Sequence, residues 1–429
     1  MRPSRCGLSS ISADPEGIEA CFRRDAGRCV AVLARALGDI DRAEDAIGDA
    51  YVTALERWPR EGFPRHPAAW ILTTARRRAI DALRRDRRGS EKQVLAARLD
   101  TAMRDAAEVA DDEMSEIPDE RLELIFACCH PSLQLEMRIA LTLRTLGGLS
   151  TEEIAAAFLV PAATMAQRIV RSKRKIREAK IPFDVPPASR LSERIDDVCT
   201  VLYLIFNQGY VATAGAALAR TDLCNEAVRL ARVLNALMPA EPEVLGLLAL
   251  MLLTHARRDA RVDESGALVT LEEQDRSRWD RSMIDEALAV LERAARHRRQ
   301  GPFQVAGAIA SMHCIARTAA DTDWRTIAAL YDCLFEMTPS AVVALNRAVA
   351  VGFATEPRDG LAALDATVGE GLLDDYYPYH VARAELSLRA GDRATARSSF
   401  ARALHLTRNE AERAFLGKRL ADAGGPSPG

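Results

Sequence analysis

Paired cysteines are missing from this chain. Its nine cysteines include no CxxC pair and their number is odd, whereas a disulfide framework normally has an even number at regular spacings. A signal peptide or membrane span is also not expected, because the N-terminus lacks an apolar core and no run of roughly 18 uncharged apolar residues occurs. We therefore expect a globular, cytoplasmic protein in a reducing compartment, without membrane contact.

Signatures of catalysis and of cofactor binding are missing as well. The sequence contains no GxSxG, Walker-type or Rossmann glycine pattern, and its histidines lack the spacing partners typical of catalysis. Cys128, Cys129 and His130 invite a zinc interpretation, but zinc ligands are normally paired through a turn and completed by a second pair elsewhere. We expect buried core cysteines, no metal, no cofactor and no enzymatic activity.

Alternating strand patterns are scarce, and nearly every segment shows the helical period of roughly 3.6 residues. The sequence predicts an all-α fold with a first helical block at 15–88, an acidic linker at 89–117 and a second block at 118–181. The proline-rich stretch IPFDVPPAS then breaks the helical pattern. An alanine- and leucine-rich helical extension is expected at 190–429.

Residues 149–177, LSTEEIAAAFLVPAATMAQRIVRSKRKIR, carry the features of a helix-turn-helix in order. Ser150 and Glu153 are spaced as a capping box that starts a short helix, and Pro161 suits the first position of the next helix. Apolar positions of that next helix fall on one stripe: Met165, Ile169 and Ile176. Its other faces are rich in arginine and lysine, so the pattern predicts a helix that enters a DNA groove.

The formal charge of −3 hides two basic windows. Residues 165–180 hold seven lysines and arginines against one glutamate, and residues 71–90 hold seven arginines against two aspartates. Such side chains neutralise phosphates and release counterions, so affinity for duplex DNA falls steeply with salt. A solvated helix face is the alternative for either run alone. The helix-turn-helix pattern favours DNA binding for the first.

The extension has repeat-like spacing. The segment AGDRATARSSFARALHL (390–406) places Gly391 in a turn and small residues on the following helix, as in the second half of a tetratricopeptide repeat. Stacked helix pairs of this type leave a concave surface for a partner. An ordinary helical bundle without a groove is the alternative.

Together these segments resemble a bacterial RNA polymerase sigma factor of the extracytoplasmic-function type, in the subgroup with a C-terminal tetratricopeptide-like extension. The matching stretches follow the family's order: 41–59, 67–85, 126–176, 202–210, 255–263, 275–280 and 338–351. The resemblance makes the first block region two, which binds core polymerase and the minus-10 promoter element. It makes the second block region four, which binds the minus-35 element.

The resemblance assigns a polymerase-binding role to an acidic helix face whose carboxylates recur at spacings of three and four: Asp41, Glu44, Asp45 and Asp49. The implied partners are the β′ clamp helices and the β subunit of core RNA polymerase. A solvent-facing acidic helix is the alternative for these residues alone. Related proteins commonly have Gln where this chain has Gly48, and because an interior glycine destabilises a helix, the contact with core polymerase is expected to be weaker there.

A proline-punctuated loop and the arginine-rich helix after it are implied to capture minus-10 bases through stacking and cationic groups. The candidates are Arg65, His66, Trp70, Arg76, Arg77 and Arg84. Arg77 stands where related proteins often have Asn, which is expected to change how this strand is read.

In the helix-turn-helix, the N-terminal side chains of the second helix are expected to face bases and the later cations to hold phosphates. Thr164, Gln167 and Arg168 form the first group. Arg171, Lys173 and Arg174 form the second.

The leading hypothesis is therefore an alternative sigma factor that binds core polymerase and directs it to a class of promoters. A stand-alone helix-turn-helix regulator with a tetratricopeptide-like sensor domain is the alternative, and a repeat scaffold with incidental basic patches is a third. We hypothesise that the extension folds back on the DNA-binding blocks, docks on polymerase or binds a regulatory protein.

Overall fold

The structure, a computed structural model, describes these residues: 15–85, 120–158, 160–210, 221–263, 267–367, 373–407 and 409–424. Within them the regular elements are helices, and isolated bridge residues such as Val262 with Leu268 form no strand, which confirms the predicted all-α fold. The acidic linker expected at 89–117 lies outside the described residues. The chain divides into two compact units, which we call the N-terminal unit (Met1–Val201) and the C-terminal unit (Leu202–Gly429).

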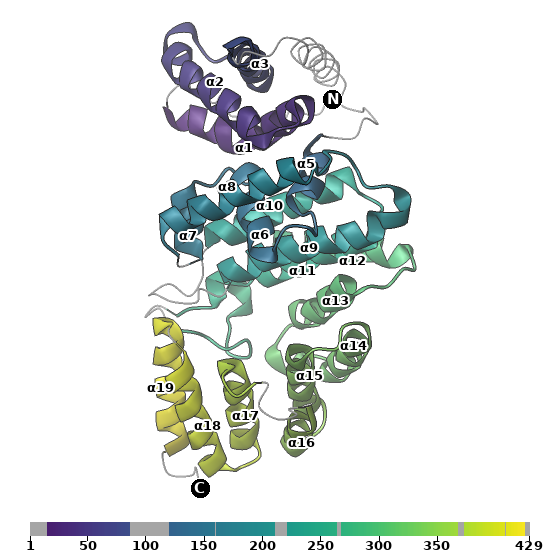
Figure 1. Cartoon of the computed structure of the whole chain (residues 1–429). Helices are drawn as coiled ribbons and strands as arrows, with labels where there is room; N and C mark the ends of the chain where they lie inside the picture. The colour runs from purple at the N-terminus through teal and green to yellow at the C-terminus, as the bar shows by residue number, and fades with distance from the viewer. Residues whose placement is uncertain are drawn as a thin grey trace, which may run out of the picture. The chain divides into compact units, whose positions relative to one another are not determined.

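The N-terminal unit begins with three helices that pack on one another: α1 (Pro15–Leu37), α2 (Ile40–Glu61) and α3 (Pro67–Arg85) (Figure 1). The Asp39 carboxylate caps α2 by accepting from the backbone amides of Asp41 and Arg42. The helix ends at Glu61 and is followed by the capping residue Gly62, which has a φ of +87° that favours glycine. Trp58 lies buried at the end of α2 against Phe63 and Trp70.

The second block contains four helices: α5 (Glu120–Cys128), α6 (Leu135–Thr145), α7 (Thr151–Ala157) and α8 (Ala162–Glu178). The predicted capping box of α7 is present, because the Glu153 amide donates to Ser150 Oγ at 3.1 Å and the Ser150 amide donates to the Glu153 carboxylate at 2.7 Å. Pro161 was expected at the first helical position but caps α8 instead, because its extended ψ of 141° starts the helix one residue later. Helices α7 and α8 pack on each other and on α6, as a helix-turn-helix does.

The C-terminal unit continues from the end of α9 (Ala188–Tyr210), within which the boundary between the units falls. Its α-helices are α10 (Thr221–Leu237), α11 (Pro242–His255), α12 (Arg281–Arg296), α13 (Pro302–Ile315), α14 (Trp324–Met337), α15 (Ala341–Ala354), α16 (Pro357–Thr367), α17 (Tyr377–Arg389), α18 (Arg393–Leu406) and α19 (Glu410–Gly424). Each packs mainly on its neighbours in the sequence, and α11 also packs on α13; Figure 1 shows α14, α15 and α16 side by side. Packing of this kind is typical of stacked helical repeats.

Small residues allow close approach inside the C-terminal unit. A Cβ atom on Gly246 of α11 would lie 2.5 Å from the backbone nitrogen of Gln304 in α13. At the contact of α15 with α16, a Cβ atom on Gly360 would lie 2.7 Å from the Cα atom of Gly352. Helix α11 is buried along nearly its whole length, which explains its almost uniformly apolar sequence, PEVLGLLALMLLTH.

Candidate nucleic-acid interface

Helix α8 buries one stripe and exposes the opposite one. Met165, Ile169, Ser172 and Ile176 are buried, which confirms the apolar stripe predicted for this helix. Because successive helical positions are about 100° apart, the face opposite this stripe carries Thr164, Gln167, Arg171 and Arg174. All four of these side chains are exposed. They are the part of the predicted minus-35 set that is open to a groove in this conformation.

Two members of the same predicted set lie on the flanks of α8 and are engaged. The Arg168 guanidinium is 3.1 Å from the Glu136 carboxylate of α6, and its side chain is 30% exposed. The Lys173 side chain is 10% exposed and faces α2, with its Nζ atom 2.9 Å from Glu44 and 3.0 Å from Asp41. In this conformation Lys173 therefore binds two of the predicted polymerase-binding carboxylates.

The electrostatics of Lys173 follow from that geometry. Burial alone would lower the pKa of Lys173, but the Glu44 and Asp41 carboxylates more than offset burial and raise it. The ammonium group is therefore held in its charged form. A buried ammonium is stable here only because carboxylates surround it.

Further polar contacts join the two helical blocks, and a single sequence gave no signal for them. Arg177 of α8 lies 3.5 Å from Asp39 and 3.8 Å from Asp41. The Thr145 hydroxyl donates to Glu44 at 2.9 Å. Helix α1 also packs on α5. We use the name α2–α8 contact for the contacts of Asp39, which caps α2, and of Asp41 and Glu44 with Lys173 and Arg177 of α8. The bond from Thr145 at the end of α6 is included in it.

The other two carboxylates of the predicted set, Asp45 and Asp49, lie beside this contact on α2, and Lys173 is close enough to act on Asp45. Asp45 and Asp49 are exposed, and partial burial and then the neighbouring Asp41 carboxylate raise the pKa of Asp45. The same exposed face continues into Val52 and Leu55, which are 56% and 47% exposed. Sequence reasoning missed these two apolar residues, although their spacing of three places them in line with Asp45 and Asp49. Such an exposed apolar pair beside carboxylates is typical of a protein-binding surface.

The predicted minus-10 residues lie in the loop before α3 and along this helix. Arg65 and His66 are exposed in the loop before this helix, and Arg77 is exposed on it. Trp70 is half-buried with its ring 5.3 Å from that of Trp58, and Arg76 is half-buried. Arg84 lies in the last turn of α3, but its side chain lies outside the described residues. The loop thus presents two cationic or titratable side chains beside a partly exposed indole, a suitable platform for an unstacked base.

The cysteines that invited a zinc interpretation are in the core. Cys128 and Cys129 are fully buried, and Cys129 Sγ lies 3.6 Å from the Thr142 hydroxyl. Burial raises the pKa of the Cys129 thiol to about 12. In the described ranges no three cysteine, histidine or carboxylate side chains are grouped as metal ligands would be. None of the helices described there is both long and apolar enough to cross a membrane.

Comparison with known proteins gives matches to three families. The family described as Sigma-70 region 2 matches residues 21–89, and Sigma-70, region 4 matches residues 123–176. A family of unknown function, DUF6596, matches residues 194–295. An uncharacterised protein of Rhizobium meliloti (strain 1021) is 43% identical over 415 residues, covering 96% of this chain and 94% of its own length. No solved structure matches the chain.

Proposed function

Because the chain belongs to the sigma-70 family, as an extracytoplasmic-function type of sigma factor with a C-terminal helical extension, we propose that it binds core RNA polymerase and directs it to one class of promoters. The family makes it a transcription initiation factor with promoter recognition as its role. The individual residues that touch DNA and polymerase are our proposal. The observation that carries it is the exposed cationic face of α8 in a helix-turn-helix with a buried apolar stripe.

For the minus-35 element, Thr164 and Gln167 lie at the N-terminal end of the exposed face of α8, where recognition helices meet base edges. Arg171 and Arg174 continue the same face one and two turns later and suit phosphates. Arg168 joins the base-reading group when it exchanges the Glu136 carboxylate for a base edge. Substituting a base-reading residue is expected to relax sequence choice, whereas substituting a phosphate-binding residue weakens binding to all sequences.

For core polymerase, Asp45 and Asp49 offer exposed carboxylates to a basic partner. Val52 and Leu55 extend that surface with apolar area, which gives a desolvated centre to an otherwise charged contact. We add these two residues to the polymerase-binding set. The loop and helix around Trp70 would hold the minus-10 strand.

The α2–α8 contact describes the free protein, before it binds core polymerase. While Lys173 lies against Asp41 and Glu44, the Lys173 and Glu44 side chains are largely covered, at 10% and 17% exposed, whereas Asp41 is paired but stays 43% exposed. We propose that α8 leaves α2 when the protein joins core polymerase, because the basic clamp helices then replace Lys173 and Arg177 as partners of the carboxylates. A switch of partners between like groups needs little net free energy, since each charge stays paired.

Run-off transcription with purified core polymerase tests the proposal. We expect promoter-dependent transcripts from the wild-type chain, a weaker association with core polymerase for Leu55→Ala, and altered promoter choice for Gln167→Ala. A matched control for Leu55→Ala is Leu135→Ala in α6, an exposed leucine outside the proposed polymerase-binding set. A chain that binds DNA alone but never supports initiation would instead be a stand-alone regulator.

The role of the extension follows from the same assay. We propose that it acts within the chain or through a regulatory protein. Truncation after Val201 keeps Asp197, which lies 2.6 Å from Arg138 of the helix-turn-helix block, whereas truncation near residue 189 removes that partner. Transcription that rises on truncation would make the extension inhibitory, and transcription that disappears from a folded truncate would make it necessary.

A further inference from the structure

The C-terminal unit contains a cavity of about 410 Å³ that the sigma function does not use. Its walls come from the loop at 268–276, the starts of α14 and α17, and the facing sides of α15, α17 and α19. A volume in this range is that of small-molecule pockets, which are lined mainly by apolar side chains with a few placed polar groups.

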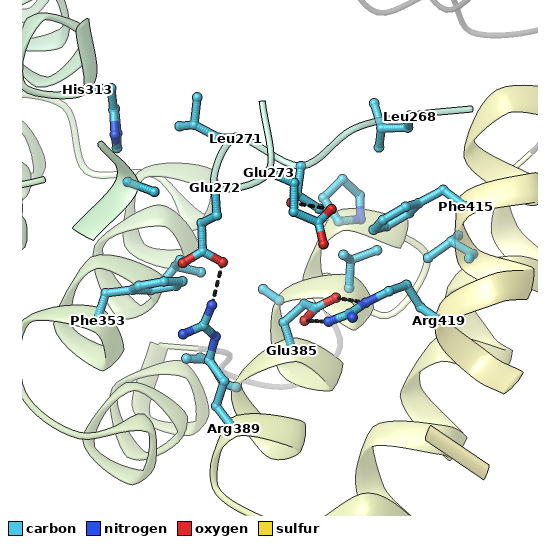
Figure 2. Close-up of a pocket in the computed structure, with 18 of the residues that line it drawn as sticks. Leu268, Leu271, Glu272, Glu273, His313, Phe353, Glu385, Arg389, Phe415 and Arg419 are labelled. Carbon is cyan, nitrogen blue, oxygen red and sulfur yellow. Dashed lines mark hydrogen bonds and ion pairs between the residues drawn. The ribbon is translucent and has the colours of Figure 1, made fainter. Parts of the chain in front are cut away.

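Most of the cavity wall is apolar. Figure 2 shows Leu268 and Leu271 at the loop, Phe353 on one side and Phe415 on the other. The Phe353 ring is already engaged, because Trp324 stacks on it with ring centres 4.3 Å apart and the Arg389 guanidinium lies 4.2 Å from its centre. The body of a ligand would therefore meet fixed aromatic and aliphatic surfaces.

The wall of the cavity carries more anionic than cationic side chains. The cavity is lined by four glutamates, three arginines and one histidine. Arg389 is paired with Glu272, and Arg419 is paired with Glu385, with Nε 2.7 Å from the carboxylate (Figure 2). Burial, then Arg257 and Arg276, lower the pKa of His313 to about 4, so this imidazole is neutral near neutral pH.

The other two carboxylates accept from hydroxyl groups, and each also lies near an arginine: Glu412 near Arg261 and Glu273 near Arg419. Glu412 is buried and accepts from the Tyr377 and Thr407 hydroxyls, each at 2.5 Å. Glu273 is exposed, accepts from the Thr270 hydroxyl at 2.9 Å and points from the loop toward the Arg419 side of the cavity (Figure 2). The third arginine, Arg276, is turned to backbone, donating to the Ala316 carbonyl at 2.9 Å. Among the described ion pairs none includes Glu273, so the loop side of the cavity carries a carboxylate without a directly bonded arginine.

We propose that this cavity is a binding site for a small amphipathic cation, a molecule with an apolar body and one ammonium, phosphonium or guanidinium group. Its body fills the space between Phe353 and Phe415, and its charge lies beside Glu273. An anion of the same shape would either lie beside these carboxylates or displace a glutamate from its arginine, and both alternatives are unfavourable in a partly desolvated site. The site lies wholly in the C-terminal unit, so its existence does not depend on the proposed sigma function.

Two pairs of probes with matched shapes and opposite charges test the site on the full chain without polymerase. Tetraphenylphosphonium and 4-phenylbutylamine are the cations, and tetraphenylborate and 4-phenylbutyrate are their anionic counterparts. Calorimetric titration in a sodium buffer is expected to show saturable binding of at least one cation and binding of its anionic counterpart that is about tenfold weaker or absent.

Variants assign the binding to the cavity. Glu273→Gln removes the open carboxylate from an exposed loop position and is expected to weaken cation binding about tenfold. Val349→Phe fills the cavity from α15 and is expected to abolish binding. Its melting temperature shows whether the variant folds. If it does not fold, the result for Glu273→Gln tests the inference. Glu336→Gln, an exposed glutamate of α14 outside the cavity, is the matched control and should bind as the wild type does.

Several results would overturn the inference: neither cation binds, the anions bind as tightly as the cations, or Glu273→Gln and Glu336→Gln bind alike. Each of these would leave the proposed promoter recognition untouched, because no step of this measurement involves DNA or polymerase.

Discussion

The α2–α8 contact and the contact of α11 with α13 are built from different interactions. The first joins carboxylates to Lys173 and Arg177 at distances of 2.9 to 3.8 Å, and several of these side chains remain open to water. The second brings Gly246 against the backbone of Gln304 between two largely apolar helices. The more exposed pairs of Arg177 are weak and screened by salt, and the largely buried Lys173 depends on its carboxylates to stay charged, whereas buried apolar packing depends on neither salt nor charge. We therefore expect the α2–α8 contact to open during function and the contact of α11 with α13 to stay closed.

Fixing the α2–α8 contact covalently should have the largest effect, loss of all transcription. A carbodiimide activates a carboxylate, and a neighbouring lysine attacks it after losing its proton, forming an amide while the carbodiimide leaves as a urea. Lys173 Nζ lies 2.9 Å from Glu44 and 3.0 Å from Asp41. We expect an amide between Lys173 and one of these residues, detected by peptide mass spectrometry, and no run-off product from the coupled protein. High salt or prior binding of core polymerase should lower the yield of the amide.

The matched control is Lys173→Arg, which keeps the positive charge but has no amine to couple. The same treatment should leave its transcription nearly unchanged. Lys175, exposed on a different face of α8, should give no amide with α2. A coupled wild-type protein that still initiates would show that the contact does not have to open.

The second prediction concerns the C-terminal unit, which contains the apolar contact of α11 with α13. Acidification is expected to destabilise this unit. Burial, then Arg258, lower the pKa of His255 from 6.5 to about 4, and its Nε2 donates to the Asn225 side-chain oxygen at 2.7 Å. The unfolded chain takes up a proton near pH 6.5 and the folded chain only near pH 4, so stability is complete above pH 6.5 and is lost as the pH falls toward 4. The contribution is up to about 3 kcal/mol.

Calorimetric melting between pH 7 and pH 5 measures this effect. His255→Gln should show a smaller fall in the melting temperature of the C-terminal unit than the wild type, because glutamine keeps a donor but does not titrate. His297→Gln, at an exposed position, is the control and should fall as the wild type does. Equal falls for both variants would refute the role of His255.

Replacing Gly246 by a larger residue should destabilise the contact of α11 with α13. The Cβ atom of Gly246→Ala would lie 2.5 Å from the Gln304 nitrogen, so α11 and α13 must separate, at a cost of about 1–3 kcal/mol. Gly417→Ala in α19 is the control, since no atom lies within 4 Å of its new Cβ and a helical alanine is favoured by about 0.5–1 kcal/mol. Opposite shifts of melting temperature are expected. A Gly246→Ala protein that melts like the wild type would show that the two helices adjust freely.

Features set by neighbouring residues were predictable from the sequence. The Ser150 and Glu153 capping box involves residues three apart, and the buried stripe of α8 follows from one helical period. The order and type of the helices in the N-terminal unit follow from the same local rules. These interactions need no knowledge of the tertiary fold, which is why the helix-turn-helix could be recognised from the chain alone.

Features set by distant residues were not predictable. Lys173 was assigned to DNA phosphates, but it pairs with Glu44, which lies 129 positions earlier in the chain. Similarly, buried Glu243 of α11 accepts from the backbone amides of Phe303 and Gln304 at the start of α13, about 60 positions away. No periodicity in one sequence reveals which charges meet across the fold. The minus-35 role of Lys173 therefore stays a prediction that depends on the opening of the α2–α8 contact.

The smallest expected effect concerns the helix that carries the acidic face. Gly48 lies exposed inside α2 with no atom within 4 Å of an added Cβ, so Gly48→Ala should stabilise this helix by about 1 kcal/mol. Gly62→Ala at the end of the same helix is the matched control and should destabilise it, because Gly62 has a φ of +87°. Hydrogen exchange of the α2 amides measures both. Faster exchange in Gly48→Ala would contradict this prediction. It would mean that α2 requires glycine at position 48, and that the α2–α8 contact depends on the α2 backbone as well as on its charges.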